Sequence, residues 1–281
     1  MRILVTGGSG FIGGRLISFL KSQGHSIIVL DKNPPTFDVE YVIGDISNPD
    51  IIDHNYGKVD FIFHIAAQSG GYFSLENSYE DAMWNSVGTM NVVKLSQKLK
   101  VKKLVYTSSM AVYGNQENAF EDGKVNPISF YGSSKLSAEY FVKLLKEHDN
   151  IPYTIFRLFA TYGAGQDLKN KHQGILSIYL DQALKSNTIK ITGSKNRVRE
   201  LVHVNDVVQA LILSFKESTN NETYNVTCNE RLTPEIIINE IGNRLNKELL
   251  IEEIEGYVGD QVLITGSNQK LKEIGWDTTF K

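Results

Sequence analysis

The first half of the chain alternates short, almost continuously apolar segments with longer segments that are apolar on one side. The short segments have strand length, and the longer ones carry apolar residues at the three- and four-residue spacing of a helix. The predicted strands are Arg2–Thr6, 26–30, 41–43, 60–66, 103–108 and 153–159, and the predicted helices are 11–23, 79–98 and 130–147. Strands that alternate with helices indicate βαβ units, and continuous apolar strands are typical of a parallel sheet covered on both faces. We therefore expect an α/β fold with a doubly wound parallel sheet.

This alternation loosens after about residue 165 of the 281. Three further helices are predicted at Ile175–Lys185, 205–216 and Pro234–Leu245, and shorter extended pieces at 189–191, Arg199–His203, 223–227 and 249–254. Thr233 before Pro234 has the character of a helix cap followed by a first-turn proline. We expect residues 1–165 to form the main domain, to which 200–217 return, and residues 166–281 to form a smaller C-terminal lobe.

A glycine cluster, T-G-G-S-G-F-I-G, separates the first predicted strand from the first predicted helix. Gly7 permits a tight turn, Gly10 lets the backbone approach a diphosphate, and Gly13 lets the helix pack closely against the strand. The helix that begins at Phe11 and Ile12 then offers free N–H groups to phosphates. The cluster lacks the lysine and hydroxyl residue of a nucleoside-triphosphate loop. The pattern is typical of a dinucleotide site.

Asp31 ends the second predicted strand, about twenty residues after the glycine cluster. A carboxylate there accepts hydrogen bonds from the adenosine ribose and repels a 2′-phosphate, which favours NAD over NADP. The alternative is that Asp31 is only a turn residue before Lys32 and Asn33. Together with the glycine cluster, Asp31 predicts a Rossmann-type NAD-binding domain.

Tyr131 and Lys135 lie four residues apart in a predicted helix, and therefore on one face of it. A free phenol has a pKa near 10, and a nearby ammonium favours its ionised form. Upstream, a predicted strand ends in the hydroxyl run Thr107, Ser108 and Ser109. Strand C-termini line the binding crevice of a parallel sheet, so a hydroxyl there can bind the oxygen on which Tyr131 acts. The alternative is a solvated helix face.

Composition narrows the function classes. The net charge is −3, with 41% hydrophobic and 22% charged residues, which argues against disorder and against a protein that wraps nucleic acid. One cysteine, Cys228, excludes an internal disulfide and a multi-cysteine metal site, and no metal site is expected. No apolar run approaches membrane-spanning length, and the first residues lack the features of a signal peptide. We expect a cytoplasmic protein with no membrane or nucleic-acid partner.

Seven motifs occur here in one family's order and spacing: T-G-G-S-G-F-I-G, H-I-A-A-Q, N-S-V-G-T, S-S-M-A-V-Y-G, Y-G-S-S-K, R-L-F-A-T-Y-G and H-V-N-D. Over essentially its whole length, the chain resembles the extended short-chain dehydrogenases/reductases of the nucleotide-sugar epimerase/dehydratase group. The resemblance implies that Tyr131 is the acid/base, that Lys135 activates it and binds a ribose, and that Ser109, rather than its neighbour Ser108, is the catalytic hydroxyl.

The resemblance also implies the binding residues. The expected cofactor-binding residues are Gly7, Gly10, Phe11, Ile12, Gly13, Asp31, Lys32, Asp45, Ile46, Ala66, Ala67, Gln68, Asn85, Thr107, Tyr131 and Lys135. Asp45 and Ile46 correspond to the adenine contacts, and Asn85 to a residue that supports the site from the facing helix. The expected substrate-binding residues are Ser109, Tyr131, Gln166 and Arg199.

The chain departs from the family in three places. Family dehydratases carry Asp-Glu directly after the catalytic hydroxyl, where this chain has Met110 and Ala111, so we reject a 4,6-dehydratase. Ala160 replaces the usual asparagine at the substrate diphosphate. The usual arginine before a late Gly-Asp is absent, because Tyr257 and Val258 precede that pair here. Arg199 is the expected diphosphate ligand, with Arg197 as its near substitute.

The expected function is that of an NAD-dependent epimerase of a nucleotide-activated sugar, at C4 through a 4-keto intermediate. A one-way oxidoreductase (a 4-keto-sugar reductase or C4 dehydrogenase) is the main alternative, and a non-catalytic dinucleotide sensor is a remote one. The resemblance also implies a homodimer through the helices predicted at 79–98 and 130–147. His64 is expected to be a core residue and His203 a structural one, whereas Tyr72, Phe73 and Tyr162 either line the sugar pocket or only pack.

Overall fold

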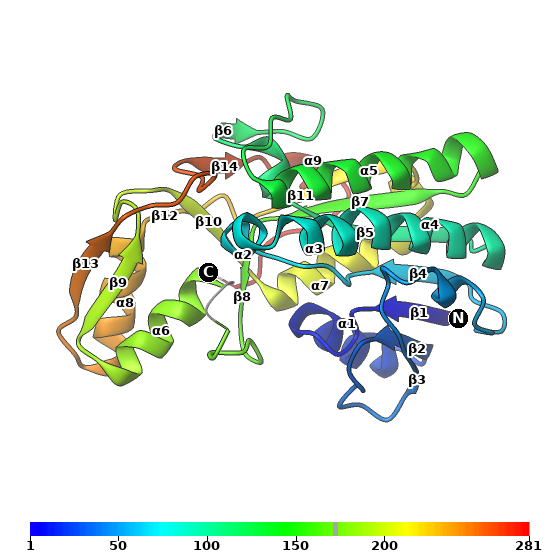
Figure 1. Ribbon diagram of the computed structural model, residues 1–281, viewed down its shortest axis with the longest axis horizontal. Coiled ribbons are helices and arrows are strands. Elements are labelled where there is room, and N and C mark those ends of the chain that lie inside the picture. Colours follow the sequence, from blue (N-terminus) through cyan, green and yellow to red (C-terminus); the bar gives the residue numbers. More distant parts are fainter. Residues whose placement is uncertain (171–173, 281) are drawn as a thin grey trace.

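The computed structural model describes residues 1–170 and 174–280, and its centre is a parallel sheet of seven strands (Figure 1). In spatial order the strands are β11 (Glu222–Val226), β7 (Tyr153–Leu158), β5 (Lys103–Ser109), β4 (Phe61–His64), β1 (Arg2–Thr6), β2 (Ser26–Asp31) and β3 (Glu40–Ile43). Every neighbouring pair is parallel. The chain winds outward from β1 in one direction and then, from β4, in the other, which confirms the doubly wound fold. The crevice between the carboxyl ends of β1 and β4 is the place where such sheets bind ligands.

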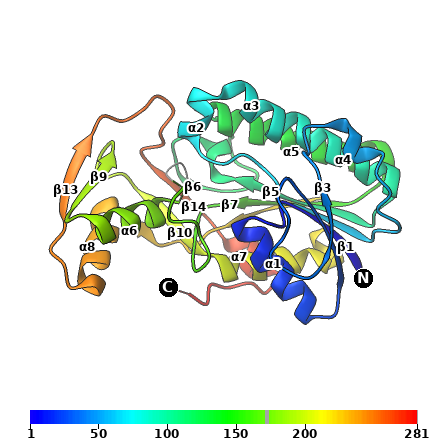
Figure 2. The same cartoon turned by 60° about the horizontal axis from the view of Figure 1, so that its bottom comes forward.

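Helices cover both faces of this sheet (Figure 2). One face carries α3 (Ser78–Ala82), α4 (Gly88–Leu99) and α5 (Phe130–Asp149), and the other carries α1 (Phe11–Ser22) and α7 (Val204–Ile212). Alternate residues of β1 enter different cores: Ile3 and Val5 pack with α1 and α7, whereas Leu4 packs with α4 and α5. Burial on both faces is why the strands are continuously apolar in sequence.

The helix predicted at 79–98 is interrupted by a π-helical turn, Met83–Val87, between α3 and α4. A π turn inserts one extra residue into the helical path, and such turns are frequent at functional sites. Asn85 in this turn is buried, and its side chain accepts a hydrogen bond from Gln68 N at 2.9 Å. Because the apolar spacing on either side is nearly unchanged, the insertion left no signal in the pattern.

The smaller region consists of short sheets and helices beside the carboxyl edge of the main sheet (Figure 1). Its elements, with the short pieces that join it to the main sheet, are α2 (Gly71–Glu76), β6 (Gln116–Ala119), β8 (Ala160–Tyr162), α6 (Ile175–Lys185), β9 (Thr188–Thr192), β10 (Arg199–His203), β12 (Arg231–Leu232), α8 (Pro234–Leu245), β13 (Leu250–Ile254), β14 (Ile264–Gly266) and α9 (Gln269–Glu273). Thr233 caps α8 as predicted, with its hydroxyl accepting from Ile236 N at 3.2 Å. The third hydrophobic core lies here, between α6, α8 and β9.

One strand lies in a different sheet from the one expected. The sequence predicts residues 223–227 in the smaller lobe, but β11 is the edge strand of the main sheet, paired with β7. A short strand in a late position carries no sign of its pairing partner, because pairing is decided by tertiary packing rather than by local pattern. The division of the chain at residue 165 stays a prediction.

Candidate active site

The glycine cluster forms a tight cradle at the carboxyl end of β1. Gly7 has a positive φ of 73°, and a Cβ built on it would lie 2.5 Å from Ala66 N. A Cβ on Gly13 would lie 2.1 Å from the Gly7 carbonyl oxygen. Neither position therefore accepts a larger residue. Gly10 precedes α1 and places no side chain over its first N–H groups, so a diphosphate can approach them.

The end of β2 forms the ribose side of the site. The Asp31 carboxylate accepts hydrogen bonds from Ser9 N and Asn33 N, both at 3.0 Å, which fixes its orientation. Lys32 pairs with Asp45 at 2.9 Å, and its ammonium lies 3.8 Å from the centre of the Trp84 ring. Burial raises the pKa of Asp45, but hydrogen bonds from Lys32 and Ser47 outweigh it and hold that pKa below its usual value.

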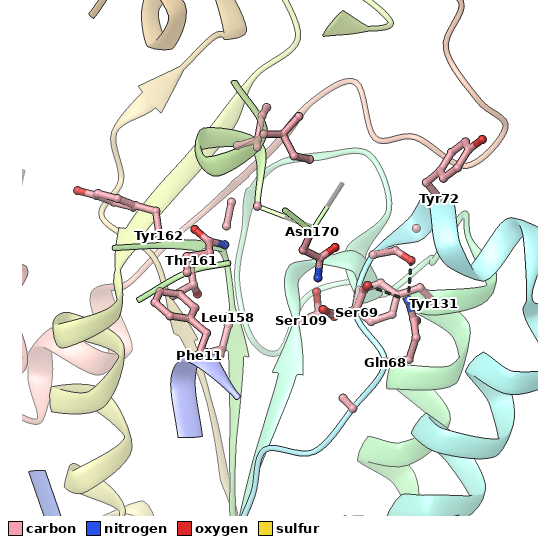
Figure 3. Close-up of a pocket in the computed structure, with 18 of the residues that line it drawn as sticks. Phe11, Gln68, Ser69, Tyr72, Ser109, Tyr131, Leu158, Thr161, Tyr162 and Asn170 are labelled. Carbon is pink, nitrogen blue, oxygen red and sulfur yellow. Dashed lines mark hydrogen bonds between the residues drawn. The ribbon is translucent and has the colours of Figure 1, made fainter. Parts of the chain in front are cut away.

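Ser109, Tyr131 and Lys135 line the same cavity beyond this cradle, and Figure 3 shows Ser109 and Tyr131 there. Ser109 is the last residue of β5, whereas Tyr131 and Lys135 lie in the first turns of α5. Ser129 caps α5 by accepting from Gly132 N at 3.0 Å. The Lys135 ammonium donates to the Thr107 carbonyl oxygen at 2.7 Å and lies 4.4 Å from the centre of the Tyr106 ring. Packing of α5 against β5 thus brings Tyr131 and Lys135 of the helix close to Ser109 of the strand.

Burial sets the protonation of this pair. It raises the pKa of Tyr131 to about 12, while a hydrogen bond with Ser109 lowers that pKa and the charge of Asp81 raises it. Burial lowers the pKa of Lys135 to about 7, against the opposing effect of Glu139 and Asp81. Tyr131 alone is therefore a proton donor at neutral pH, and it becomes a base only where further positive charge favours the phenolate.

A cavity of about 1450 Å³ joins these groups to the smaller region. Of the predicted site residues, all line this cavity except Asp45 and Asn85, which lie behind Lys32 and Gln68 respectively. Figure 3 shows Ser109 and Tyr131 with Gln68 and Asn170 on one side, and Phe11 with Thr161 and Tyr162 on the other. Tyr72 and Tyr162 line the cavity, whereas Phe73 stacks against Trp84 at 6.1 Å.

The far wall of the cavity holds two arginines that share one carboxylate. Asp260 pairs with Arg197 at 2.5 Å and with Arg199 at 3.0 Å, and all three side chains are almost fully buried. The Nε atom of Arg197 is buried and has no hydrogen-bond partner among the residues that the structure describes. Burial, and then the charge of Arg197, lowers the pKa of Arg199 to about 10. Two buried cations and one anion leave a net positive charge, which suits an anionic ligand.

The interpretation of the sequence missed several residues of this cavity. Asp260 was predicted only as part of a late Gly-Asp pair. Ser69 and Asn170 lie between predicted elements and Trp84 lies inside a predicted helix, and none of the three belongs to a motif that indicates a site. Asp81 was also missed, because a buried carboxylate is not visible in an exposed-looking helical pattern. Within residues 1–170 and 174–280, no group of His, Cys, Asp and Glu side chains is arranged to hold a metal ion. In the same ranges, none of the helices has the length and apolar character needed to cross a bilayer.

Comparison with known proteins identifies the family to which the chain belongs. Residues 3–227 match the model of the NAD dependent epimerase/dehydratase family. The chain belongs to that family. It is therefore an NAD-dependent enzyme of the extended short-chain dehydrogenase/reductase type, as its motifs imply, and the glycine cradle with Asp31 fits a dinucleotide.

Relatives within the epimerase/dehydratase family carry out several reactions. A putative UDP-glucose 4-epimerase of Methanocaldococcus jannaschii is 35% identical over 86% of this chain and 83% of its own length. A UDP-glucuronic acid decarboxylase of Danio rerio is 29% identical over 75% of this chain and 53% of its own length. The UDP-glucose 4-epimerase of Thermotoga maritima, solved with UDP-glucose, superposes with a TM-score of 0.93 at 26% identity and covers 100% of this chain and 94% of its own. These proteins share one family, but the reactions that their names give are different.

Proposed function

We propose that this enzyme is an NAD-dependent epimerase of a nucleotide-activated sugar, acting at C4 through a 4-keto intermediate. The observation that carries the proposal is the arrangement of one cavity, with Ser109 and Tyr131 in its middle and the Arg197–Arg199 pair on its far wall. This order of groups along the cavity suits a sugar held between a cofactor and a diphosphate. The 4-epimerases among the similar proteins support the same reaction.

Each residue at the centre of the cavity has its own role in the proposed reaction. Tyr131 takes the proton of the C4 hydroxyl, and Ser109 holds that oxygen through its own hydroxyl. NAD, which the glycine cradle and Asp31 would hold, would supply the acceptor for the C4 hydride and the source of its return to the other face of the ketone. Lys135 supplies the positive charge that keeps Tyr131 as a phenolate in the first step, and Tyr131 returns the proton in the second. Turning of the ketone between the two steps inverts C4.

The residues after Ser109 favour epimerisation over elimination of water. Met110 and Ala111 stand there, and both line the cavity. A thioether and a methyl group cannot exchange a proton with C5 or C6 of a sugar. The site is therefore equipped for removal and return of a hydride but not for dehydration through these positions.

The substrate diphosphate lies against the Arg197–Arg199 pair in this proposal. Arg197 supplies the second guanidinium that the residues before Gly259 and Asp260 do not, and Asp260 orients both guanidinium groups. Ala160 contributes no hydrogen bond, so the diphosphate depends on these two cations. Gln166 faces the same cavity and stays a predicted substrate contact.

We also propose that the enzyme is a homodimer. Four large apolar side chains on α3, α4 and α5 are exposed to solvent: Tyr79, Met90, Tyr140 and Leu144. A stripe of large apolar side chains on neighbouring helices is typical of a surface covered by a partner. The cytoplasm stays the compartment expected from the sequence.

The direct test is product analysis with purified enzyme. We expect bound NAD(H), and conversion of one UDP-, GDP- or dTDP-linked hexose to its C4 epimer without net change in the absorbance of reduced nicotinamide. Tyr131→Phe and Lys135→Ala should each lower kcat at least about 100-fold with folding retained. Tyr140→Phe, which changes an exposed tyrosine of the same helix, should leave kcat unchanged.

Two results would count against this function. Enzyme that carries no NAD(H) and forms no epimer from any of these sugars would contradict it. Stoichiometric accumulation of reduced or oxidised nicotinamide would instead identify a one-way oxidoreductase.

A further inference from the structure

A buried carboxyl group that the proposed mechanism does not use lies directly behind the catalytic helix. Asp81 of α3 is completely inaccessible to solvent, at 0% exposure. In the described ranges, no lysine, arginine or histidine lies within 4.0 Å of it to form an ion pair. An unpaired acid in this position costs stability unless hydrogen bonds and nearby charge compensate it. Its surroundings therefore show how it is compensated.

Two donors point at Asp81. The Asn85 amide nitrogen, which can only donate, lies 3.0 Å from Oδ1 and 3.1 Å from the Ser134 hydroxyl oxygen. Ser134 accepts that bond and donates its own hydrogen to Asp81 Oδ2 at 2.6 Å. Both carboxyl oxygens of Asp81 are thus acceptors, as in an ionised carboxylate. Ser134 lies between Tyr131 and Lys135 in α5, so these bonds fix the turn that carries both.

The same network continues to the cofactor cradle. The backbone carbonyl oxygen of Asn85 accepts from the Thr89 hydroxyl at 2.6 Å, and Thr89 in turn accepts from His64 Nε2 at 3.0 Å. His64 Nδ1 then accepts from Thr6 at 2.7 Å, and the Thr6 oxygen accepts from Ala66 N at 3.2 Å. Each hydroxyl in the chain has one donor role and one acceptor role, so His64 is neutral. Asn85 thus joins two buried hydrogen-bonded groups, one at the catalytic helix through its side chain and one at the strand ends beside the glycine cluster through its backbone.

We propose that Asp81 is a positioning residue, which holds the first turns of α5 in register with the cofactor strands and whose negative charge keeps Lys135 an ammonium. The proposal rests on the proposed function only for the reaction in which the effect is measured. The titratable groups that face Tyr131 and Lys135 are Asp81 from α3, Glu139 from α5, Tyr106 from β5 and His64 from β4. Glu139 is already neutralised by Arg157 at 2.7 Å, which leaves Asp81 as the uncompensated anion among these four.

The sign of the effect follows from the charges. The Asp81 carboxylate raises the pKa of Tyr131 and raises that of Lys135. Replacing it by a neutral side chain should lower both values. Both groups should then titrate at lower pH, and the pH profile of kcat should move in the same direction. A residue with only a packing role would lower kcat without moving that profile.

The test measures Tyr131 directly in NAD-loaded protein. Tyrosine labelled with ¹³C at the ring carbon that bears the hydroxyl reports phenolate formation by NMR, and Tyr131→Phe assigns the resonance. In Asp81→Asn, we expect the Tyr131 midpoint to fall by about half a pH unit or more, with the kcat profile shifted the same way. Asp81→Ser is a second, smaller neutral variant in case the amide distorts the fold. Glu121→Gln replaces another buried carboxylate, which accepts from Asn225 N at 2.8 Å, and should leave the midpoint unchanged.

A Tyr131 midpoint that stays in place or rises in both Asp81 variants would overturn the proposal. An equal fall in Glu121→Gln would also overturn it, because the shift would then follow from general destabilisation. The NMR measurement needs no substrate. If the unaltered enzyme forms no epimer, the proposed function fails while the titration still decides the role of Asp81.

Discussion

Lys135 is buried, and in the part of the chain that the structure describes no carboxylate pairs with it directly, so the stability of the protein depends on pH. Burial lowers its pKa from 10.5 to about 7 in the folded protein. Between pH 7 and 10.5 the unfolded chain therefore binds a proton that the folded protein does not, so this group makes folding more favourable as pH rises. Below pH 7 both states are protonated, and the full cost of burying the ammonium remains.

Lys135→Met should remove this cost together with activity. The free energy of unfolding of Lys135→Met, relative to the unaltered protein, should be greatest below pH 7 and decrease by roughly 1.4 kcal/mol per pH unit above it. The lost hydrogen bond to the Thr107 carbonyl lowers the whole curve but not its slope. Denaturant unfolding at several pH values measures both quantities.

Lys103→Met is the matched control. Lys103 is also buried, at the other end of β5, where burial lowers its pKa to about 8 and Ser214 O, Lys216 O and Thr219 Oγ1 accept its hydrogens. We expect a similar slope above pH 8, with kcat retained. A stability difference for Lys135→Met that does not vary with pH would contradict the assigned titration.

Individual site residues could be predicted from the sequence where a reactive side chain also had the spacing that brings it to the site. Tyr131 and Lys135 were predictable because four residues of helix place them on one face, and Ser109 because a strand end must meet them. Arg197 was predicted only as a near substitute for Arg199 and not as its partner on Asp260, and Asp81 was not predicted at all. Asp260 must fold back from a late loop to hold Arg197, and Asp81 gains its importance only from complete burial. Both conditions are tertiary and leave no local pattern.

At the scale of elements, the start of α5 decides where Tyr131 lies. Tyr131 is the second residue of the helix, and the Ser129 hydroxyl satisfies the N–H of Gly132 in the same turn. Ser129→Ala should lower the free energy of unfolding by about 1 kcal/mol. It should also lower kcat, because fraying of this turn moves the Tyr131 hydroxyl away from Ser109.

Thr233→Ala provides the matched comparison for this cap. Thr233 caps α8 in the smaller region by the same type of bond, so its loss should cost a similar free energy with kcat unchanged. Chemical denaturation and steady-state rates on both variants separate the two effects. Equal kcat values in the two variants would show that the α5 cap has no part in placing Tyr131.

The order of helices and strands was largely predictable, while their pairing was less so. Alternating apolar segments predicted the central strands because burial on both faces demands apolar residues at every position. The π turn at Met83–Val87 and the place of β11 were not predictable. One inserted residue barely changes helical periodicity, and a short strand at a sheet edge is chosen by its neighbour β7 rather than by its own residues.

At the scale of the whole molecule, the site depends on two regions that come together around one cavity. The main sheet provides the glycine cradle, Asp31 and the catalytic group, while β10 and the segment around Asp260 provide the paired arginines. Tyr72 of α2 meets Tyr257 edge-on at 5.4 Å, which closes the rim between the two regions. The small net charge of −3 thus conceals a local positive charge placed where a diphosphate is expected.

The outer helical face gives the last prediction, which concerns assembly. Tyr140 and Leu144 lie one turn apart on α5 and are 56% and 46% exposed, and Tyr79 on α3 is 74% exposed. Large apolar side chains in a continuous stripe lose contact with water when a second copy covers them. Sedimentation should therefore give a dimer, and the double change Tyr140→Glu and Leu144→Glu should give a monomer, because two buried unpaired charges oppose association. Ile236→Glu, at a 49% exposed position on α8, should leave the dimer intact. A monomer in the unaltered protein, or an unchanged dimer in the double variant, would place the interface elsewhere or remove it.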